Sequence, residues 1–396
     1  MSTISPNEFA VRREALRKIL AEKQIDLEIL NVNSDLYYYT GSVQPLYLFL
    51  PAQGEPFVLA RKAIDRIHQE IDPLAFEPFF STQDLVRIIE KRGLTSTSRI
   101  GFSLDMTSYS TVTRLQRLFG QAEVVDISPD IRRLRMVKSE AEIAIQRKAG
   151  EIIAGIPDII KSDFQPGMTE LQMSAALENY LRLNGHAVLI RLRREGIETN
   201  GFGVLSSGAN SLAGTKFEGI CGGVGLSPAA PFGANQDVIQ PGIPTIFDFG
   251  VTLEGYHVDM TRMFSWGSPS QQVLDAYQAM LTIEEAVIDS LKPGTPWEEI
   301  FAKSFKLAVE LGYEEEYMGL DTEKVKFVGH GLGVELDEPP YLAPGFTDVL
   351  EEGMVVAVEP KVALRGVGIV GIEDTLVIRS TGPETLTSCS KEFIIV

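Results

Sequence analysis

Hydrophobic and polar residues follow two rhythms along the first part of the chain, one with the period of a helix and one typical of strands. Between residues 7 and 24 the apolar residues Phe9, Leu16, Ile19 and Leu20 recur at helical spacing. Strands are predicted at 25–32, 46–50, 56–60 and 121–128, and further helices at 82–93 and 107–119. This alternation predicts an α/β domain of about 130 residues.

A charged stretch separates this domain from the rest of the chain. It covers residues 130–138 and reads DIRRLRMVK, and a long helix is expected from Ser139 onward. We therefore expect one domain at residues 1–133 and a second at 134–396. The length of 396 residues agrees with two domains, because single cores rarely grow that large.

The second domain contains the same order of signals twice. Each time a helical pattern (139–162 and 270–291) is followed by a Pro-Gly pair and by a second helical pattern that ends at a glycine, Gly185 or Gly312. Both glycines suit left-handed helix caps. The repeated order of helix, Pro-Gly, helix and strands predicts two related halves.

Both second helices in this repeat carry signals for a helix start. Thr169 with Gln172 matches a capping box, and so does Thr295 with Glu298, where Pro296 is expected at the first helical position. We expect both helices to begin in the same way.

Composition and charge exclude several classes of protein. A formal net charge of −18 repels phosphate backbones and anionic lipid surfaces, so neither nucleic acid nor a membrane is expected as a partner. Cys221 and Cys389 are too few for a disulfide framework or a cysteine-based zinc site. The start of the chain is charged throughout, unlike a signal peptide, and no stretch approaches the roughly 20 apolar residues of a membrane span. We expect a cytoplasmic protein.

Three acidic residues stand where the pattern predicts buried strands: Asp248 in PTIFDFG, Glu359 in GMVVAVEP and Glu373 in GIVGIEDTLVI. A buried carboxylate without a partner is very costly. Either each acid pairs with its own cation, as Lys361 would allow for Glu359, or one divalent cation serves all three. The neighbourhoods of Asp248 and Glu359 are poor in cations, which favours a shared metal such as Mn, Fe, Co or Zn.

Asp259 follows Asp248 by eleven residues, with LEG between them as a turn, so a hairpin would bring the two carboxylates together. Arg262 is expected to brace Asp259. Asp374 should point to the opposite face from Glu373, because side chains alternate along a strand.

His330 lies in KFVGHGLG, where Gly329, Gly331 and Gly333 permit a close approach of the backbone. A single histidine is more often structural, but this surrounding makes a role as ligand or catalyst equally plausible.

These motifs together resemble a known family. DFG-x4-GY-x2-D-x-TR (248–262), GHGLG (329–333), VEP (358–360) and IEDT (372–375) resemble the pita-bread metallopeptidases, which include aminopeptidase P, prolidase and methionine aminopeptidase, with creatinase as a metal-free relative. YYYTG (37–41) and LRMVKSEAEI (134–143) resemble the creatinase-type N-terminal domain and its linker. The resemblance implies an α/β (α+β) protein with a creatinase-like N-terminal domain and a pita-bread domain with pseudo-twofold halves.

The family also implies roles for the matching residues. Asp248 would chelate one metal ion and His330 the other, Asp259 and Glu373 would bridge the pair, and Glu359 would bind the second ion and handle the proton of the nucleophilic water. Two ions about 3.5–4 Å apart lower the pKa of a bridging water and polarise the scissile carbonyl. The expected cofactors are two divalent ions, Mn being favoured over Co, Fe or Zn, and the expected assembly is a homodimer.

Three positions depart from the family pattern. The loop at 206–219 lacks the usual histidine, and Gly214 or Thr215 stands about where it should be. Asp337 takes the place of a second histidine, and Gly371 stands where prolidase-like members carry an arginine. The missing groups usually contact substrate and stabilise the tetrahedral intermediate, and an aspartate cannot donate to an oxyanion unless it is protonated.

His257 shares a strand face with Asp259 and is a candidate to compensate for the missing groups, although a structural role is at least as plausible. The catalytic candidates are therefore Glu359, Asp337 and His257.

Three functions compete. The first is a dinuclear metallopeptidase that cleaves Xaa-Pro or other short peptides. The second is a non-peptidase hydrolase of the same fold acting on a small amide-type metabolite, which the three departures favour. The third is an inactive binding module, against which five intact ligands argue.

Overall fold

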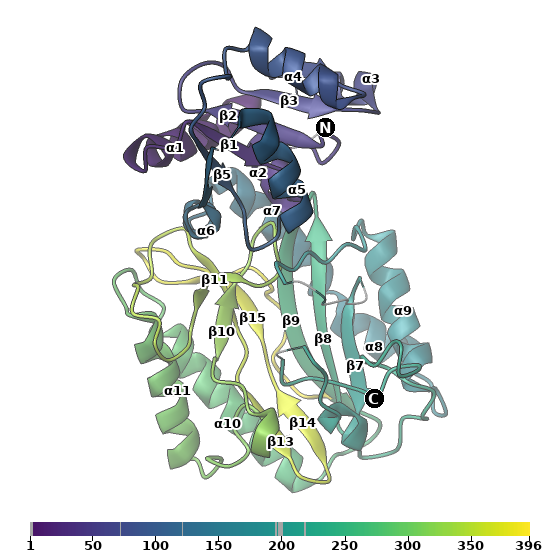
Figure 1. The fold of residues 1–396 in the computed structure, drawn as a ribbon. Helices are drawn as coiled ribbons and strands as arrows, with labels where there is room; N and C mark the ends of the chain where they lie inside the picture. Colours follow the sequence, from purple (N-terminus) through teal and green to yellow (C-terminus); the bar gives the residue numbers. More distant parts are fainter. Residues whose placement is uncertain (1–2, 72, 121, 195, 197–200, 218) are drawn as a thin grey trace. The chain divides into compact units, whose positions relative to one another are not determined.

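A computed structural model describes residues 3–71, 73–120, 122–194, 196, 201–217 and 219–396. The chain divides into two compact units, one of Met1–Arg135 with Arg193–Glu195 and one of Met136–Leu192 with Gly196–Val396 (Figure 1). The boundary expected at 133/134 falls inside helix α6 (Ser128–Met136), so the charged stretch is mainly helical. Within this helix Arg135 is buried and forms an ion pair with Asp35, the Nη1–Oδ1 distance being 3.0 Å.

The first unit is built on a six-stranded sheet in the order β4-β3-β2-β1-β5-β6, in which β2 is antiparallel to β1 and β3 and the remaining pairs are parallel. The strands are β1 (Leu27–Leu30), β2 (Tyr47–Pro51), β3 (Phe57–Ala60), β4 (Ala75–Pro78), β5 (Arg99–Phe102) and β6 (Glu123–Asp126). With α6, the helices are α1 (Pro6–Glu22), α2 (Asn33–Thr40), α3 (Ile64–Ile71), α4 (Thr82–Lys91) and α5 (Tyr109–Gln116), the last followed by the 3₁₀ turn η1 (Arg117–Phe119).

Most elements of this unit were predicted from periodicity. The helix expected at 7–24 is α1, whose first turn is capped by the Ser5 side chain and begins with Pro6. The strands expected at 25–32, 46–50, 56–60 and 121–128 are β1, β2, β3 and β6. Helices α2 and α3 and strands β4 and β5 were not predicted.

The second unit has two larger sheets, one in the order β17-β9-β8-β7 and one in the order β11-β10-β12-β15-β16, and the small pair β13-β14. In Figure 1 helices α8 and α9 lie along the first sheet, and α10 and α11 along the second. The helices are α7 (Glu140–Ile153), α8 (Ile156–Asp163), α9 (Glu170–Leu183), α10 (Gln271–Ile288) and α11 (Trp297–Glu310), with 3₁₀ turns η2 (Gly208–Leu212) and η3 (Asp321–Glu323). The strands are β7 (Gly203–Ser207), β8 (Thr245–Leu253), β9 (Tyr256–Ser265), β10 (Gly329–Gly331), β11 (Glu338–Tyr341), β12 (Val355–Val358), β13 (Lys361–Leu364), β14 (Gly368–Gly371), β15 (Asp374–Val377), β16 (Glu384–Thr385) and β17 (Ile394–Ile395).

The two halves predicted for this unit share their local geometry. The glycines of the two Pro-Gly pairs, Gly167 and Gly294, have φ of 93° and 91°, and the closing glycines Gly185 and Gly312 have φ of 103° and 86°. The residue before each second helix forms a bridge to an extended segment further along the chain: Thr169 to Val238 and Pro296 to Val349. The repeat is therefore visible in the backbone as well as in the sequence.

Two details of the predicted halves were wrong. The helix expected at 139–162 is interrupted between α7 and α8, where Pro157 lacks an N–H and cannot continue the preceding helix. The capping box is present at Thr169 and Gln172 but absent at α11, where Pro296 is the cap residue itself. The Glu298 carboxylate instead accepts a hydrogen bond from the Gly345 N–H (3.2 Å), so a tertiary contact replaces the local one.

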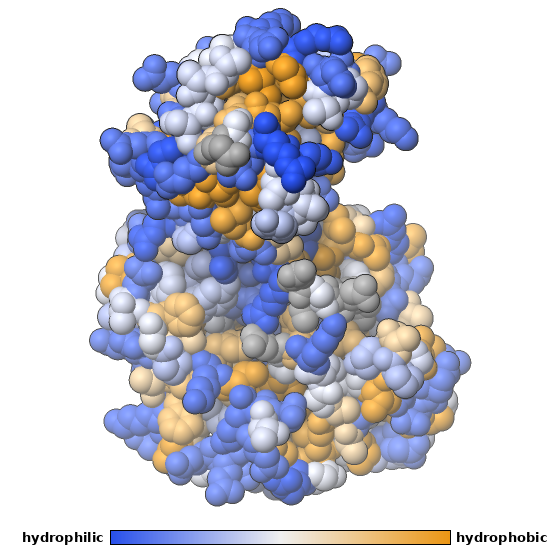
Figure 2. Space-filling view, in the orientation of Figure 1, coloured by the Kyte–Doolittle hydropathy of each residue, from blue (hydrophilic) through white to orange (hydrophobic). Residues whose placement is uncertain are grey.

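Hydrophilic side chains are spread over the face of the chain drawn in Figure 2, with apolar groups between them. Among the helices that the structure describes, none combines the length and apolar character needed to cross a membrane.

Candidate metal centre

The structure brings the five predicted ligands together in the second unit. Their potential ligand atoms form two groups, in each of which all atoms lie within 4.8 Å of one another. One group is Asp259, His330 and Glu373, and the other is Asp248, Glu359 and Glu373. Glu373 belongs to both, so the two groups form one continuous cluster.

The first two carboxylates come from the predicted hairpin. Strands β8 and β9 pair antiparallel around a turn at Glu254 and Gly255, whose φ values are 45° and 83°. Asp248 lies opposite Thr261, and Asp259 opposite Gly250. Because residues two apart share a face, both carboxylates project from the same side of the hairpin.

Glu359 and Glu373 flank the equivalent strands of the second half, Glu359 directly after β12 and Glu373 directly before β15. Glu373 is held against β9 by an antiparallel bridge with Thr261, in which each residue's N–H donates to the other's carbonyl oxygen at 3.3 and 3.2 Å. The Thr261 hydroxyl also donates to Glu373 Oε2 at 2.7 Å. The bridge therefore joins the two halves at the centre of the cluster.

His330 occupies a crowded position in β10, between β11 and β12. A Cβ on Gly329 would lie 2.2 Å from the carbonyl oxygen of Ala357, and one on Gly331 would lie 2.3 Å from that of Pro339. The predicted close backbone approach is thus confirmed. With Nδ1 donating to the Gly331 carbonyl (3.1 Å), Nε2 is the nitrogen directed to the cluster, 3.6 Å from Glu359 Oε1.

The cluster carries an excess of negative charge. Burial raises the pKa of Glu373 to about 8, and Glu359 and Asp248 add to this effect against the opposing influence of Lys361. Burial, together with Glu373 and Asp248, also raises the pKa of Asp259 well above its usual value. Burial alone would lower the pKa of His330, but nearby carboxylates raise it. Bound positive charge would relieve this repulsion.

The donor set fits a divalent metal ion. Carboxylate oxygens and an imidazole nitrogen are ligands that Mn, Fe, Co and Zn accept. Glu373 Oε1 is buried and has no hydrogen-bond partner among the described residues, whereas Glu373 Oε2 accepts from Thr261 and Lys361. A buried oxygen without a partner is costly unless a cation binds it.

Two residues of this centre were missed or undervalued. Lys361 was considered only as an ion-pair partner of Glu359, yet its ammonium is fully buried and contacts three carboxylates of the cluster. The Cys221 thiol donates a hydrogen bond to Asp248, and burial followed by the nearby Asp248 raises its pKa well above the usual value. No periodic or motif signal marks Cys221, because the glycine-rich loop that carries it reaches the site only through the tertiary fold.

The catalytic candidates separate in the structure. Glu359 is in the cluster, and the half-buried Asp337 lies close enough to His330 to be the main carboxylate raising its pKa. His257 is fully buried, and both of its ring nitrogens bond to the backbone: Nδ1 to the Gly333 carbonyl (2.9 Å) and Nε2 to the Arg191 N–H (3.1 Å). Because both ring nitrogens are engaged by the backbone, the contacts of His257 support the structural role rather than the catalytic one.

The remaining departures have local explanations. The Thr215 hydroxyl accepts from the Phe217 N–H (3.2 Å), and a Cβ on Gly214 would lie 2.3 Å from Glu323 Oε2. Gly371 lies directly opposite Lys361 in the β13–β14 pair.

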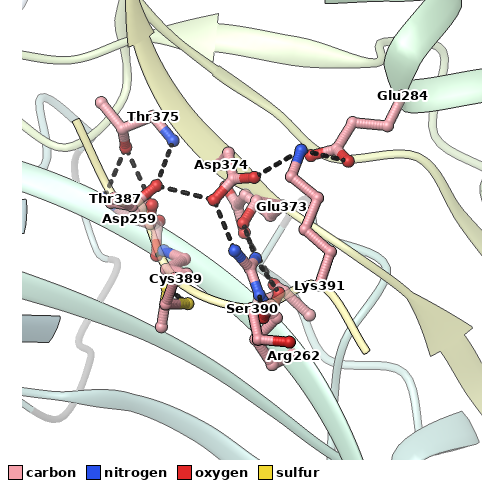
Figure 3. Close-up of polar contacts among 12 residues, drawn as sticks. Asp259, Arg262, Glu284, Glu373, Asp374, Thr375, Thr387, Cys389, Ser390 and Lys391 are labelled. Atoms are coloured by element: carbon pink, nitrogen blue, oxygen red, sulfur yellow. Dashed lines mark hydrogen bonds and ion pairs between the residues drawn. The ribbon is translucent and has the colours of Figure 1, made fainter. Parts of the chain in front are cut away.

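The prediction that Arg262 braces Asp259 is wrong. The Arg262 side chain projects from the other face of β9 and forms an ion pair with Asp374, the Nη2–Oδ1 distance being 2.8 Å (Figure 3). It also donates to the carbonyl of Glu373 (2.7 Å), so it supports the metal centre only through the backbone. The reason is that side chains alternate between the two faces of a strand, and Arg262 follows Asp259 by three residues, so the two lie on opposite faces of β9. The same period correctly placed Asp374 opposite to Glu373.

Comparison with known proteins agrees with this fold. Residues 144–380 match the model of metallopeptidase family M24, and residues 12–137 match that of the creatinase/prolidase N-terminal domain. Among curated proteins, the chain is 29% identical to the uncharacterized peptidase YqhT of Bacillus subtilis over 98% of this chain and 100% of that protein. It is 25% identical to an Xaa-Pro dipeptidase of Pyrococcus horikoshii, over 97% and 99% of the two chains.

Solved structures show the same fold. An Xaa-Pro dipeptidase from Bacillus anthracis superposes with a TM-score of 0.82 at 24% identity and covers 98% of this chain and 100% of its own. The prolidase from Pyrococcus horikoshii gives a TM-score of 0.81 at 23% identity, with coverages of 97% and 99%. The predicted fold class, a creatinase-type N-terminal domain followed by a pita-bread domain, is confirmed.

Proposed function

Since this chain belongs to metallopeptidase family M24, we propose that it is a metal-dependent peptidase that cleaves short peptides, with Xaa-Pro peptides as its substrates. The observation that carries the proposal is the buried cluster of Asp259, His330 and Glu373 with the unpartnered Glu373 Oε1. The curated relatives named Xaa-Pro dipeptidase support the substrate class, at 25–28% identity.

Asp259, His330 and Glu373 are the residues that would hold a divalent ion. Such an ion, when bound, lowers the pKa of water and polarises the carbonyl of the scissile bond. Manganese is the favoured ion because two of these three ligands are carboxylates, which suit harder ions. The family resemblance also implies a second ion, with Asp248 as one of its ligands. The Lys361 ammonium already contacts the three carboxylates of that donor group, those of Asp248, Glu359 and Glu373.

Glu359 is the residue that takes the proton from the attacking water and returns it to the leaving amine. Its Oε2 accepts a hydrogen bond from the Lys361 ammonium (2.6 Å), and its Oε1 lies 3.6 Å from His330 Nε2. This arrangement orients the carboxylate within the cluster, and general acid–base catalysis of this kind contributes about 10²–10⁴-fold to a rate.

A second candidate function is hydrolysis of a small amide that is not a peptide. It is favoured by Asp337 beside His330, because a carboxylate there cannot donate a hydrogen bond to an oxyanion unless it is protonated. The different environment at Gly371, opposite Lys361, points the same way.

A substrate panel tests both candidates. Metal-loaded protein is incubated with Xaa-Pro dipeptides, longer Xaa-Pro peptides and N-acyl metabolites, with Glu359→Gln as the matched control. Metal-dependent release of proline or of the N-terminal residue, absent in the variant, supports the peptidase. Turnover of N-acyl compounds alone supports the second candidate, and no turnover of any class by protein with its metal bound contradicts both.

The homodimer implied by the family and the cytoplasmic location are also proposals. Light scattering during gel filtration tests the first, and fractionation of the source cells tests the second.

A further inference from the structure

Lys361 is placed inside one of the two donor groups of the metal centre. Its side chain is fully buried, and its Nζ lies 2.6 Å from Glu359 Oε2, 3.1 Å from Asp248 Oδ2 and 3.4 Å from Glu373 Oε2. These are the three carboxylates of the second group. An ammonium has three N–H donors, so each has a carboxylate to bind.

The facing residue makes room for this lysine. Lys361 and Gly371 lie opposite each other in the β13–β14 pair, and a Cβ on Gly371 would lie 2.3 Å from Lys361 Cγ. Any larger residue at position 371 would displace the lysine stem. Prolidase-like members of the family carry an arginine where this chain has Gly371. In this chain the glycine at position 371 and the lysine at position 361 therefore fit each other across the two strands.

The two halves of the domain differ at this point. In the first hairpin Asp248 faces Thr261, and Gly250 faces Asp259. In the second half Val358 faces Asp374 and Lys361 faces Gly371, a register in which Glu359 corresponds to Asp248 and Lys361 to Gly250. In the first half the Asp259 carboxylate stands opposite Gly250, whereas in the second half the Lys361 ammonium stands opposite Gly371.

The other donor group has no such occupant. Within the described part of the chain, Asp259, His330 and Glu373 form an ion pair with no lysine or arginine except Lys361, which reaches only Oε2 of Glu373. Glu373 Oε1 remains buried without a partner. The cluster therefore has one built-in cation on the Asp248 side and an unsatisfied oxygen shared with the other side.

We propose that the Lys361 ammonium takes the place of the second metal ion, so that this chain binds one divalent ion tightly, at Asp259, His330 and Glu373. The inference rests on the proposed metal dependence and changes the number of ions from two to one. A divalent ion entering the second group would share its oxygens with an ammonium, and the repulsion between them opposes its binding.

Metal stoichiometry tests the proposal. Full-length protein is stripped with chelator, reloaded with Mn²⁺ and measured by equilibrium dialysis with elemental analysis, beside the variants Lys361→Ala and Lys391→Ala. Lys391 is the matched control, because it also pairs with two carboxylates, Glu284 and Asp374, but outside the metal centre. We expect one ion per chain in the wild type and in Lys391→Ala, and two in Lys361→Ala, with second-ion affinity raised on the order of 100-fold.

Two ions of similar affinity in the wild type would overturn the inference and leave the proposed function intact. No bound ion in the wild type would contradict both. One ion in a folded Lys361→Ala variant would also overturn the inference, because removing the ammonium should open the second group.

If Lys361→Ala fails to fold, the wild type alone decides. Electron paramagnetic resonance of the Mn²⁺-loaded protein should show an isolated ion without spin coupling. Anomalous diffraction should locate that ion beside Asp259, His330 and Glu373. An ion among Asp248, Glu359 and Glu373 would refute the proposal.

Discussion

Glu373 and Asp374 are neighbours in the chain, but their side chains lie in opposite environments. Asp374 belongs to a closed network in which two carboxylates meet two cations: Arg262 and Lys391 each contact Asp374 at 2.8 Å, and Lys391 also contacts Glu284 at 2.8 Å (Figure 3). Glu373 belongs to a cluster of four carboxylates, its own and those of Asp248, Asp259 and Glu359, in which the Lys361 ammonium contacts three, those of Asp248, Glu359 and Glu373.

The two environments affect the acids in opposite directions. Burial would raise the pKa of Asp374, but Arg262 and Lys391 outweigh it and lower the pKa below its usual value. Burial raises the pKa of Glu373 to about 8, because the opposing influence of Lys361 does not outweigh burial together with Glu359 and Asp248. The second carboxylate of the Asp374 network behaves differently: burial and the nearby Asp374 raise the pKa of Glu284 to about 8. The two sides differ in their charge balance: two cations meet two carboxylates around Asp374, whereas the cluster around Glu373 has one cation and four carboxylates. Such an excess of buried negative charge favours the binding of a metal ion.

The largest effect should follow from a change on the Glu373 side. We expect Glu359→Gln to lower turnover by about 10³-fold, because the variant cannot accept a proton. Its melting temperature should stay within a few degrees of the wild type. Steady-state kinetics on the best substrate of the panel and a thermal melt measure the two quantities. Full activity in the variant would refute the role of Glu359.

On the opposite face the loss should appear in stability. We expect Asp374→Asn to lower the free energy of unfolding by about 3–5 kcal/mol, because it leaves the buried Arg262 without its ionic partner. Urea denaturation of metal-free protein measures this loss. The folded fraction should still bind its metal ion. A loss below about 1 kcal/mol would show that the Asp374 network resembles an exposed ion pair.

The pH dependence of stability tests whether His257 acts as a buried, neutral structural residue, although it lies on the same strand as the ligand Asp259. Burial lowers the pKa of the His257 ring to about 4, against about 6.5 in an unfolded chain. Between these values the unfolded state binds a proton that the folded state does not. The stability from this residue is therefore complete above about pH 6.5 and is lost as the pH falls toward 4, by about 3 kcal/mol at most.

Urea midpoints between pH 4 and 8 measure this dependence, with His257→Gln as the control that removes the titrating ring. The variant should be less stable than the wild type at pH 8, and the difference should shrink as the pH falls. An unchanged difference across the range would contradict the assigned pKa direction.

The smallest effect should come from two matched threonines. The hydroxyl of Thr261 donates to Glu373 (2.7 Å) and that of Thr387 to Asp374 (2.8 Å). Thr261→Val should weaken metal binding by about tenfold, because a hydrogen bond that orients a ligand is lost. Thr387→Val should cost about 1 kcal/mol of stability without changing metal affinity. Equal effects of the two variants on metal affinity would remove the distinction between the faces.

Local patterns predicted a large part of the fold. Periodicity found α1 and β1–β3, and the capping box at Thr169 was confirmed by its hydrogen bonds. The same local signal failed at Thr295, where Glu298 bonds to the distant Gly345 instead. Local signals therefore identified both helices, but they predicted the capping contacts correctly only where the helix's own residues satisfy its first turn.

For the centre itself, the sequence by itself marked three acids, Asp248, Glu359 and Glu373, in apolar segments where a charge is tolerated only with compensation. The resemblance of its motifs to a family added Asp259 and His330 to the set of ligands. Only the tertiary structure decided how that compensation is divided. The register of β13 against β14 sets Lys361 over Gly371 and inside one donor group, and an antiparallel bridge sets Glu373 against Thr261 of β9. These pairings join residues far apart in the chain, and their cost and benefit arise only when burial removes water from the charges.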